Sequence, residues 1–250
     1  MKIQLITIDF WNTLFDSSNG IKRNAVRQHV FAEEIAKLDV KVSHDKFSEA
    51  VQASWEFFNN IWMNQQRTPE TIETIGYLWS YLNLPHNDNS IQRVAKSFAE
   101  SILDYPPSLM ENSFETLSNL KSRGYKLGLI SDTGFTPGSI LKMVMQNAGV
   151  LDLFDAFSFS DETGVSKPHE KAYTTILDQL SIEPMNSLHI GDIEKTDIVG
   201  AKKVGMRAIR FSGDQTAVLN KDNNKITLAD SEIFNWNEFE STLVEIENSI

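Results

Sequence analysis

Four short segments, far apart in the sequence, each place a polar side chain at or just beyond the end of an apolar run. They span residues 5–9, 127–132, 164–168 and 187–192. Helical patterns separate the later segments, and strands that alternate with helices form parallel βαβ units. Because the carboxyl ends of parallel strands meet at one edge of a sheet, the polar side chains of the four segments are expected to converge there.

The order of the expected elements predicts an α/β fold with a doubly wound, parallel, Rossmann-like sheet that is covered by helices on both faces. We expect strands over residues 2–9, 125–131, 157–160, 187–190, 207–211 and 226–228. We expect helices over residues 114–123, 139–148, 169–180 and 197–204, a closing helix near 236–246, and a loop over 212–224.

The stretch from about Asn24 to Tyr105 has a different pattern, in which apolar residues recur every three or four positions. The pattern predicts an all-helical insertion that is too long to be a loop. We therefore expect residues 1–15 and 106–250 to form a core domain and residues 16–105 to form a helical cap domain. The helical spacing leads us to interpret three tryptophans as packing residues rather than a ligand platform: Trp55, Trp62 and Trp79.

The charge of the chain limits the classes of partner. With 23 Lys+Arg and 34 Asp+Glu the formal net charge is −11, which argues against binding to nucleic acid or to an anionic membrane. The chain has no cysteine, no apolar run of the ~18–20 residues that a membrane helix needs, and no visible secretory signal. We expect a cytoplasmic protein, a monomer or homodimer, that acts on a small molecule.

Residues of the four segments have side chains suited to phosphoryl transfer. The Asp9 carboxylate can attack phosphorus and form an acyl phosphate that water later cleaves. Ser131 can donate a hydrogen bond to a phosphoryl oxygen, and Lys167 can pair with both the nucleophile and the transferring group. Mg²⁺ prefers oxygen ligands, which makes Asp9 and Asp192 its natural direct ligands. Asp197, at the start of a predicted helix, can hold a metal-bound water or orient Lys167.

In their order and placement, the four segments resemble the motifs of the haloacid dehalogenase-like (HAD) hydrolase superfamily, whose members mostly hydrolyse phosphate esters through an aspartyl intermediate. The resemblance implies Mg²⁺-dependent hydrolysis of a small phosphorylated metabolite and a helical cap that closes over the site. It also implies that the backbone carbonyl of Trp11 is a third metal ligand. In the substrate-binding set it places Asp132 beside Ser131 and Lys167.

One position departs from the family pattern. The phosphatases of this superfamily carry a second aspartate two residues after the nucleophile, where it protonates the leaving oxygen, whereas this chain has Trp11. An indole offers one N–H donor and no useful acid–base chemistry. Asn12, which follows, replaces the usual glycine and tolerates a left-handed backbone.

Three functions therefore stay open. The first is a phosphatase whose leaving group needs little protonation, or one that acts slowly. The second is a dehalogenase-like enzyme, although Asp192 and Asp197 preserve a metal pattern that halide displacement does not require, and residues 39–41 lack the arginine expected there. The third is a catalytically weakened binding or regulatory protein on the same fold.

Overall fold

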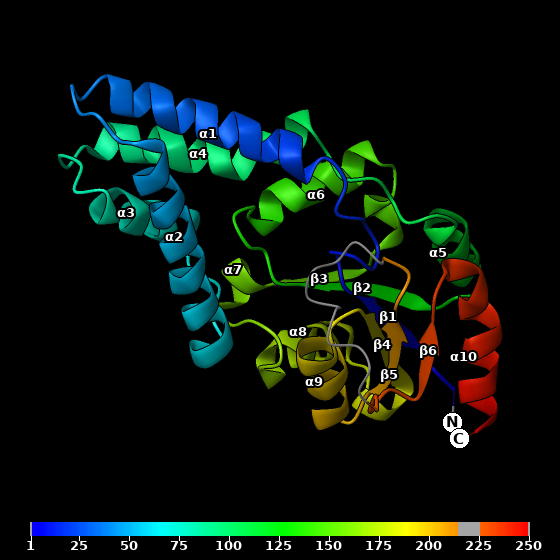
Figure 1. Cartoon of the computed structure of the whole chain (residues 1–250). Coiled ribbons are helices and arrows are strands. Elements are labelled where there is room, and N and C mark those ends of the chain that lie inside the picture. The colour runs from blue at the N-terminus through cyan, green and yellow to red at the C-terminus, as the bar shows by residue number, and fades with distance from the viewer. Residues whose placement is uncertain (1, 215–225, 250) are drawn as a thin grey trace.

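The computed structural model describes residues 2–214 and 226–249, and this part of the chain forms one six-stranded sheet. The strands are parallel and lie in the order β3-β2-β1-β4-β5-β6 (Figure 1). Their bounds are β1 Leu5–Ile8, β2 Lys126–Ser131, β3 Ala156–Phe159, β4 Ser187–Gly191, β5 Arg207–Phe211 and β6 Ser231–Ile233. The strand order reverses between β1 and β4, which is where ligands bind in doubly wound sheets. The predicted fold class is confirmed.

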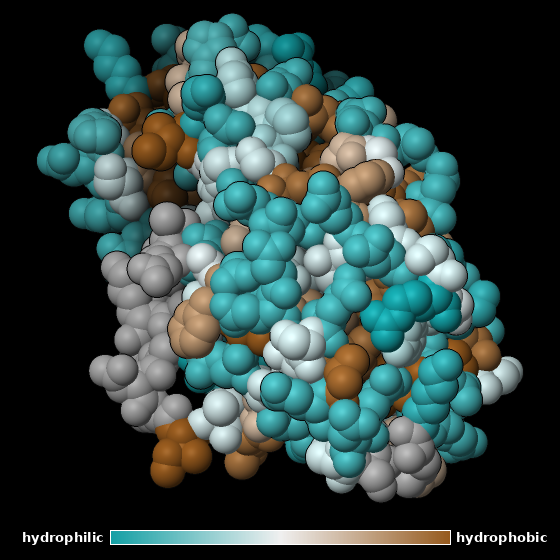
Figure 2. Space-filling view, turned by 90° about the vertical axis from the view of Figure 1, so that its right-hand side faces the viewer, coloured by the Kyte–Doolittle hydropathy of each residue, from teal (hydrophilic) through white to brown (hydrophobic). Residues whose placement is uncertain are grey.

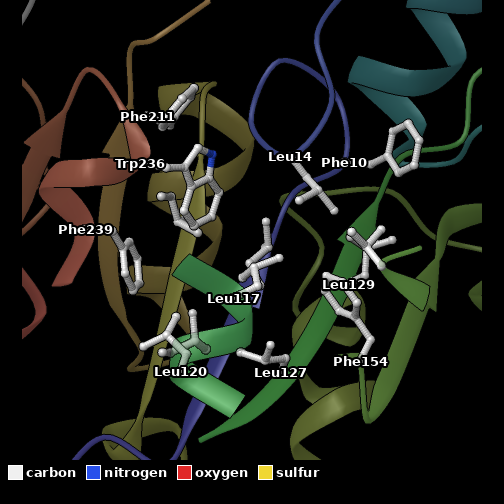
Figure 3. Close-up of a cluster of buried hydrophobic side chains, with 14 of the residues drawn as sticks. Phe10, Leu14, Leu117, Leu120, Leu127, Leu129, Phe154, Phe211, Trp236 and Phe239 are labelled. Atoms are coloured by element: carbon white, nitrogen blue, oxygen red, sulfur yellow. The ribbon is translucent and has the colours of Figure 1, made fainter. Parts of the chain in front are cut away.

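Helices cover both faces of the sheet, as buried parallel strands require. Side chains of α5, α6 and α10 pack on one face, and side chains of α8 and α9 pack on the other. Figure 3 shows part of the first cluster, where Leu117 and Leu120 of α5 gather with Leu127, and Trp236 lies between Phe211 and Phe239. The bounds are α5 Ser113–Ser122, α6 Gly138–Asn147, α8 Glu170–Leu180, α9 Val199–Lys203 and α10 Phe239–Asn248.

Five short helical turns complete this part of the structure. Three of them are 3₁₀ turns, one is a wide turn of π-helix, and one is a single turn of α-helix. They are η1 Leu151–Leu153, η2 Pro184–Asn186, η5 Trp236–Glu238, η3 Glu194–Ile198 and α7 Ser160–Thr163. The wide turn η3 follows β4 directly and shapes the loop that leaves the sheet at the switch point.

Four helices between β1 and α5 form what we call the helical insertion, at the upper left of Figure 1. Residues 24–100, all within the described part of the chain, contain no strand. The insertion has its own cluster of buried side chains, which includes Phe31 of α1, Leu78 and Trp79 of α3, and Val94 of α4. The bounds are α1 Gly20–Ala36, α2 His44–Gln65, α3 Thr71–Tyr81 and α4 Asp88–Asp104.

The strand predicted over residues 226–228 is wrong. These residues lie outside the sheet: Ile226 is 95% exposed, and the backbone N–H of Leu228 donates to Glu194. The sixth strand is β6, further along, whose Ile233 is buried beside β5. A run of three residues is too short for its apolar-polar pattern to fix which run pairs with the sheet edge.

Other elements lie close to their predicted positions, with two exceptions. The helix predicted to start at Asp197 begins earlier, because η3 places Asp197 inside a wide turn that leads into α9. The loop predicted over 212–224 lies outside the described residues from position 215 onward.

The two edge strands, β3 and β6, are each held by an aspartate that precedes the strand. Asp155, just before β3, accepts a hydrogen bond from the backbone N–H of Leu127 on β2 at 2.9 Å. Asp230, just before β6, accepts one from the N–H of Ala208 on β5 at 2.8 Å. Each carboxylate also pairs with two cations, Lys121 and Lys126 at Asp155, and Lys202 and Arg207 at Asp230. These aspartates therefore stabilise two short strands, each of which pairs with only one neighbouring strand.

The surface agrees with the acidic, polar composition. On the face shown in Figure 2, hydrophilic residues predominate and apolar residues form small, separate groups. Within the described residues, no helix is both long enough and apolar enough to cross a membrane.

Candidate active site

The structure brings six of the seven predicted site residues to one cavity. Its volume is about 260 Å³, and it lies between the carboxyl ends of the strands and helix α2. The six residues are Asp9, Trp11, Asp132, Lys167, Asp192 and Asp197. The seventh, Ser131, ends β2, and its buried hydroxyl donates to the backbone oxygen of Asp132 at 3.3 Å instead of lining the cavity.

Lys167 lies at the centre of the charged part of the site. Its Nζ donates to Oδ1 of Asp9 at 2.5 Å and to Oδ1 of Asp197 at 2.6 Å, and all three side chains are buried. Burial lowers the pKa of Lys167, but the negative charges of Asp197 and Asp9 outweigh it and hold the pKa well above its usual value. The ammonium therefore stays charged and bridges the predicted nucleophile and Asp197.

The carboxylates outnumber the cations at the site. Among the described side chains that line the cavity, four are aspartates and Lys167 is the only cation. Burial raises the pKa of Asp9, and the charges of Asp197 and Asp192 raise it further against the effect of Lys167. A second positive charge would relieve this repulsion and keep Asp9 ionised.

His189 is a site residue that the sequence did not reveal. It is fully buried on β4. Its Nε2 lies 3.1 Å from Oδ1 of Asp197, and its Nδ1 lies 2.9 Å from Oγ1 of Thr7. With Asp197 ionised, the ring donates through Nε2 and accepts through Nδ1. Burial lowers the pKa of His189, so the neutral ring holds the carboxylate in place.

Asp197 is fixed on its other side as well. Its Oδ2 accepts from the backbone N–H of Ile193 at 3.1 Å and from Oγ1 of Thr196 at 3.0 Å. Gly191 makes room for it, because a Cβ there would lie 2.4 Å from the Asp197 carboxyl carbon. Although burial raises the pKa of Asp197, Lys167 and His189 hold it well below the usual range. The side chain is a rigid, charged support for Lys167.

The loop after the nucleophile contains Trp11 and Asn12. Trp11 is half-buried, with its ring edge-on to Phe10 at 4.9 Å between centroids, and the Arg23 guanidinium lies 5.9 Å from the Trp11 ring. Asn12 has a φ of 55°, as its tolerance of the left-handed region predicted, and its Nδ2 donates to Oδ2 of Asp192 at 3.3 Å. The tryptophan therefore faces the cavity, and Asn12 braces the second candidate metal ligand.

Helix α2 forms the opposite wall. Our interpretation of Trp55 and Trp62 as packing residues is wrong in part, because both line the cavity, while Trp79 packs inside the insertion as expected. Trp62 also donates from Nε1 to Oδ2 of Asp132 at 2.8 Å. The other oxygen of Asp132 accepts from the backbone N–H of Lys167 at 3.0 Å.

A divalent cation suits the donor set at the strand ends. Asp9 and Asp192 follow neighbouring strands and line the same cavity. No three His, Cys, Asp or Glu side chains of the described residues form a group ready to hold a metal. The expected set contains only two direct carboxylates plus a backbone carbonyl, and hard oxygen donors of this kind fit Mg²⁺, which keeps several waters.

A doubly wound parallel sheet with aspartates and a buried lysine at its strand ends, beneath a helical insertion, defines a hydrolase built on a Rossmann-like core. The chain belongs to the haloacid dehalogenase-like hydrolase family, whose sequence model matches residues 3–205.

Comparisons with individual proteins agree with this family. The chain is 26% identical over 224 residues to a glyceraldehyde 3-phosphate phosphatase from Pyrococcus furiosus, covering 87% of this chain and 84% of that protein. It is 35% identical over 105 residues to a protein of the same name from Methanothermobacter thermautotrophicus, a match that covers 42% of this chain and only 45% of the relative. A crystal structure of a 2-haloacid dehalogenase from Pseudomonas syringae has a TM-score of 0.71 at 22% identity, over 98% of this chain and 99% of that one, which shows a shared fold.

Proposed function

We propose that this protein is a Mg²⁺-dependent phosphatase that hydrolyses a small phosphate ester through an aspartyl-phosphate on Asp9. The observation that carries the proposal is the buried contact of 2.5 Å between Asp9 Oδ1 and Lys167 Nζ, beside Asp192 and at the end of β1. The relatives named glyceraldehyde 3-phosphate phosphatase support a phosphorylated small molecule as substrate.

In the first half-reaction the Asp9 carboxylate attacks phosphorus, and the bond between phosphorus and the ester oxygen breaks. The ester oxygen leaves as the anion and takes a proton from solvent to give the alcohol, and the phosphoryl group stays on Asp9 as an acyl phosphate. In the second half-reaction water attacks that phosphorus, which releases inorganic phosphate and restores the carboxylate. Lys167 lies close enough to Asp9 to neutralise the transferring group in both steps.

Two further residues complete the proposed binding of the phosphoryl group. The hydroxyl of Ser131 has only a long bond of 3.3 Å to a backbone oxygen, so a phosphoryl oxygen is a competitive acceptor for it. Asp132 holds the backbone of Lys167 at the rim of the same cavity.

In this proposal Asp9, Asp192 and the backbone carbonyl of Trp11 hold the metal. Mg²⁺ supplies positive charge that lets a carboxylate approach a phosphate dianion. Asp197 already accepts four hydrogen bonds, from Lys167, His189, Ile193 and Thr196. Its part in the proposal is therefore to orient Lys167, and at most to bind a metal-held water.

The charge of the cavity favours the phosphatase over the dehalogenase. A 2-haloacid carries its own carboxylate, which needs a cationic partner. The only lining cation among the described residues is Lys167, and Asp9 and Asp197 already pair with it.

The test is a turnover screen of the purified full chain on phosphorylated metabolites and a few 2-haloacids, with Mg²⁺ and with EDTA. We expect Mg²⁺-dependent phosphate release and, after acid quenching, a hydroxylamine-sensitive phosphoryl group on the protein. Asp9→Asn abolishes both, whereas the matched control Asp104→Asn, at the exposed end of α4, leaves them unchanged. Halide release that needs no metal, or full turnover by Asp9→Asn, would refute the proposal.

A further inference from the structure

The part of the cavity that faces the carboxylates is aromatic. Helix α2 presents Trp55, Phe58 and Trp62 to it, at positions i, i+3 and i+7, which lie on one face of a helix. Trp55 and Phe58 meet edge to face, with centroids 5.9 Å apart. The indole of Trp11 comes from the core side of the same cavity.

The helical insertion contributes no charged side chain to this aromatic wall of the cavity. Its only polar contribution to the cavity other than the indole N–H groups is Asn59, the neutral amide that follows Phe58 on α2. The indole N–H of Trp62 is already donated to Asp132. Among the described residues, this wall therefore offers a neutral, apolar surface to a substrate group that projects away from the phosphoryl site, and it offers no cation to a second anionic group on the substrate.

The size of the cavity fits one ring and one phosphoryl group. An apolar cavity of about 150 Å³ holds a benzene molecule, and this cavity has a volume of about 260 Å³. Flat aromatic side chains on opposing walls favour a flat aromatic guest through stacking and edge-to-face contacts.

We propose that the substrates are phosphate monoesters of small aromatic alcohols that are neutral beyond the phosphoryl group. The proposal rests on the phosphatase function proposed above and adds the substrate class. The phosphoryl group passes from the aryl oxygen to Asp9 and then to water, so that one ester and one water give one phenol and one phosphate. Trp11 supplies no proton, and a phenolate leaves as the anion and takes its proton from solvent, which suits an aryl ester.

Four substrates distinguish the effect of an aromatic group on binding from the effect of the leaving group on the rate. Phenyl phosphate is aromatic with a good leaving group, benzyl phosphate is aromatic with a poor one, acetyl phosphate is non-aromatic with a good one, and glycerol phosphate is non-aromatic with a poor one. We expect KM to be about ten-fold lower for the two aromatic esters, because an apolar ring leaves water. We expect kcat to follow the leaving group instead.

Two variants of α2 locate the effect. Trp55→Ala removes an aromatic wall residue that is 44% exposed and therefore tolerant of truncation. It is expected to raise KM about ten-fold for phenyl and benzyl phosphate and to raise KM for glycerol phosphate by a much smaller factor. Phe57→Ala is the matched control, because Phe57 lies on the same helix but stacks on Tyr77 at 4.4 Å between centroids, and it does not line the cavity.

A binding measurement makes the result independent of turnover. In the Asp9→Asn full chain, calorimetry is expected to show phenylphosphonate binding about ten-fold more tightly than methylphosphonate. Equal KM values for aromatic and non-aromatic esters, together with equal phosphonate affinities, would overturn the aromatic preference and leave the phosphatase proposal standing. Tighter phenylphosphonate binding without turnover of any ester would overturn the phosphatase proposal alone.

Discussion

The indole Nε1 of Trp62 donates to Oδ2 of Asp132 at 2.8 Å and so connects helix α2 of the insertion to the end of strand β2. Oδ1 of the same carboxylate holds the backbone N–H of Lys167. Next to it, the N–H of Ser166 donates to the backbone oxygen of Gln66, the residue that follows α2, at 2.7 Å. The insertion thus contacts both the aspartate and the loop that position Lys167.

We predict that Trp62→Phe slows turnover, because it breaks the hydrogen bond through which the insertion contacts Asp132. Phenylalanine keeps most of the apolar wall but removes the N–H that donates to Oδ2 of Asp132, a half-buried carboxylate. A hydrogen bond to a charged group contributes roughly 1.5–3 kcal/mol, so kcat/KM is expected to fall by about ten-fold or more. In a double-mutant cycle with Asp132→Asn, most of this loss disappears, because both variants break the same bond.

Trp79→Phe is the control for this prediction. It also removes one indole hydrogen bond within the insertion, from Nε1 of Trp79 to the backbone oxygen of Pro85, but Trp79 packs in the insertion's own cluster and does not line the cavity. It is expected to lower the melting temperature and to show no coupling to Asp132→Asn. Equal coupling for the two tryptophans would mean that general loosening of the insertion, rather than the Trp62 bond, sets the rate.

The proposed Mg²⁺ site gives a second prediction, which distinguishes Asp192 as a direct metal ligand from Asp197 as a residue that positions Lys167. Mg²⁺ is expected to raise the free energy of unfolding, by about 2.7 kcal/mol at a concentration of 100 Kd. Asp192→Asn abolishes this stabilisation and the calorimetric binding signal. Asp197→Asn keeps Mg²⁺ binding but lowers kcat, because the ammonium of Lys167 loses its second anchor. Loss of Mg²⁺ binding in Asp197→Asn would instead make Asp197 a direct ligand.

The third prediction concerns Asp155, just before the edge strand β3, and the way its contribution to the stability of the fold depends on pH. Although burial raises the pKa of Asp155, its bonds to Lys121, Leu127 and Lys126 hold the pKa below the usual range. A carboxyl whose folded pKa lies below its unfolded value stabilises the fold fully above the unfolded pKa of about 3.9, and the effect is lost as pH falls through the folded pKa. Asp155→Asn is therefore expected to cost roughly 1–3 kcal/mol at pH 7.

Urea unfolding at a series of pH values checks this prediction. The difference between wild type and Asp155→Asn is expected to be constant from pH 7 to about pH 5 and to shrink at lower pH. Asp104→Asn, at the exposed end of α4, is the matched control and is expected to show no such trend. A difference that stays constant down to acid pH would assign the cost to packing rather than to the carboxylate charge.

The sequence reveals Asp9 and Asp192 because strand ends can be read from short apolar runs, and parallel strands bring those ends together. It does not reveal the bonds of His189, since these depend on register: Thr7 of β1 pairs with His189 of β4, and only that pairing sets Nδ1 against the threonine hydroxyl. No local pattern encodes a register between strands that are far apart in the sequence.

The tryptophans of α2 show a similar limit to what the sequence alone predicts. Helical spacing identifies which residues share a face, and Trp55 and Trp62 do share one. It does not say what that face contacts. Trp79, with the same kind of spacing, packs inside the insertion, whereas the face of α2 points toward the strand ends. The difference comes from how the insertion is seated on the core, which is a tertiary property.

The last prediction concerns Trp11, which, by the family resemblance, stands at the position of a catalytic acid. If the indole merely replaces that acid, turnover depends steeply on the leaving group, and aryl phosphates react far faster than alkyl phosphates. Trp11→Asp is expected to raise the ratio of alkyl to aryl rates on the order of ten-fold or more, because an unprotonated alkoxide is a poor leaving group. Trp11→Phe is the matched control, since it keeps an aromatic ring beside Phe10 and adds no acid.

Folding must be equal for this comparison, because removal of a large half-buried ring leaves a void that destabilises the loop. Melting temperatures of both variants therefore accompany the rates, and the ratio of alkyl to aryl turnover cancels any common loss of active protein. A ratio that rises in Trp11→Asp but not in Trp11→Phe places the side chain at position 11 beside the leaving oxygen. A ratio that is the same in all three proteins shows that position 11 does not reach this oxygen, and the proton must then come from solvent.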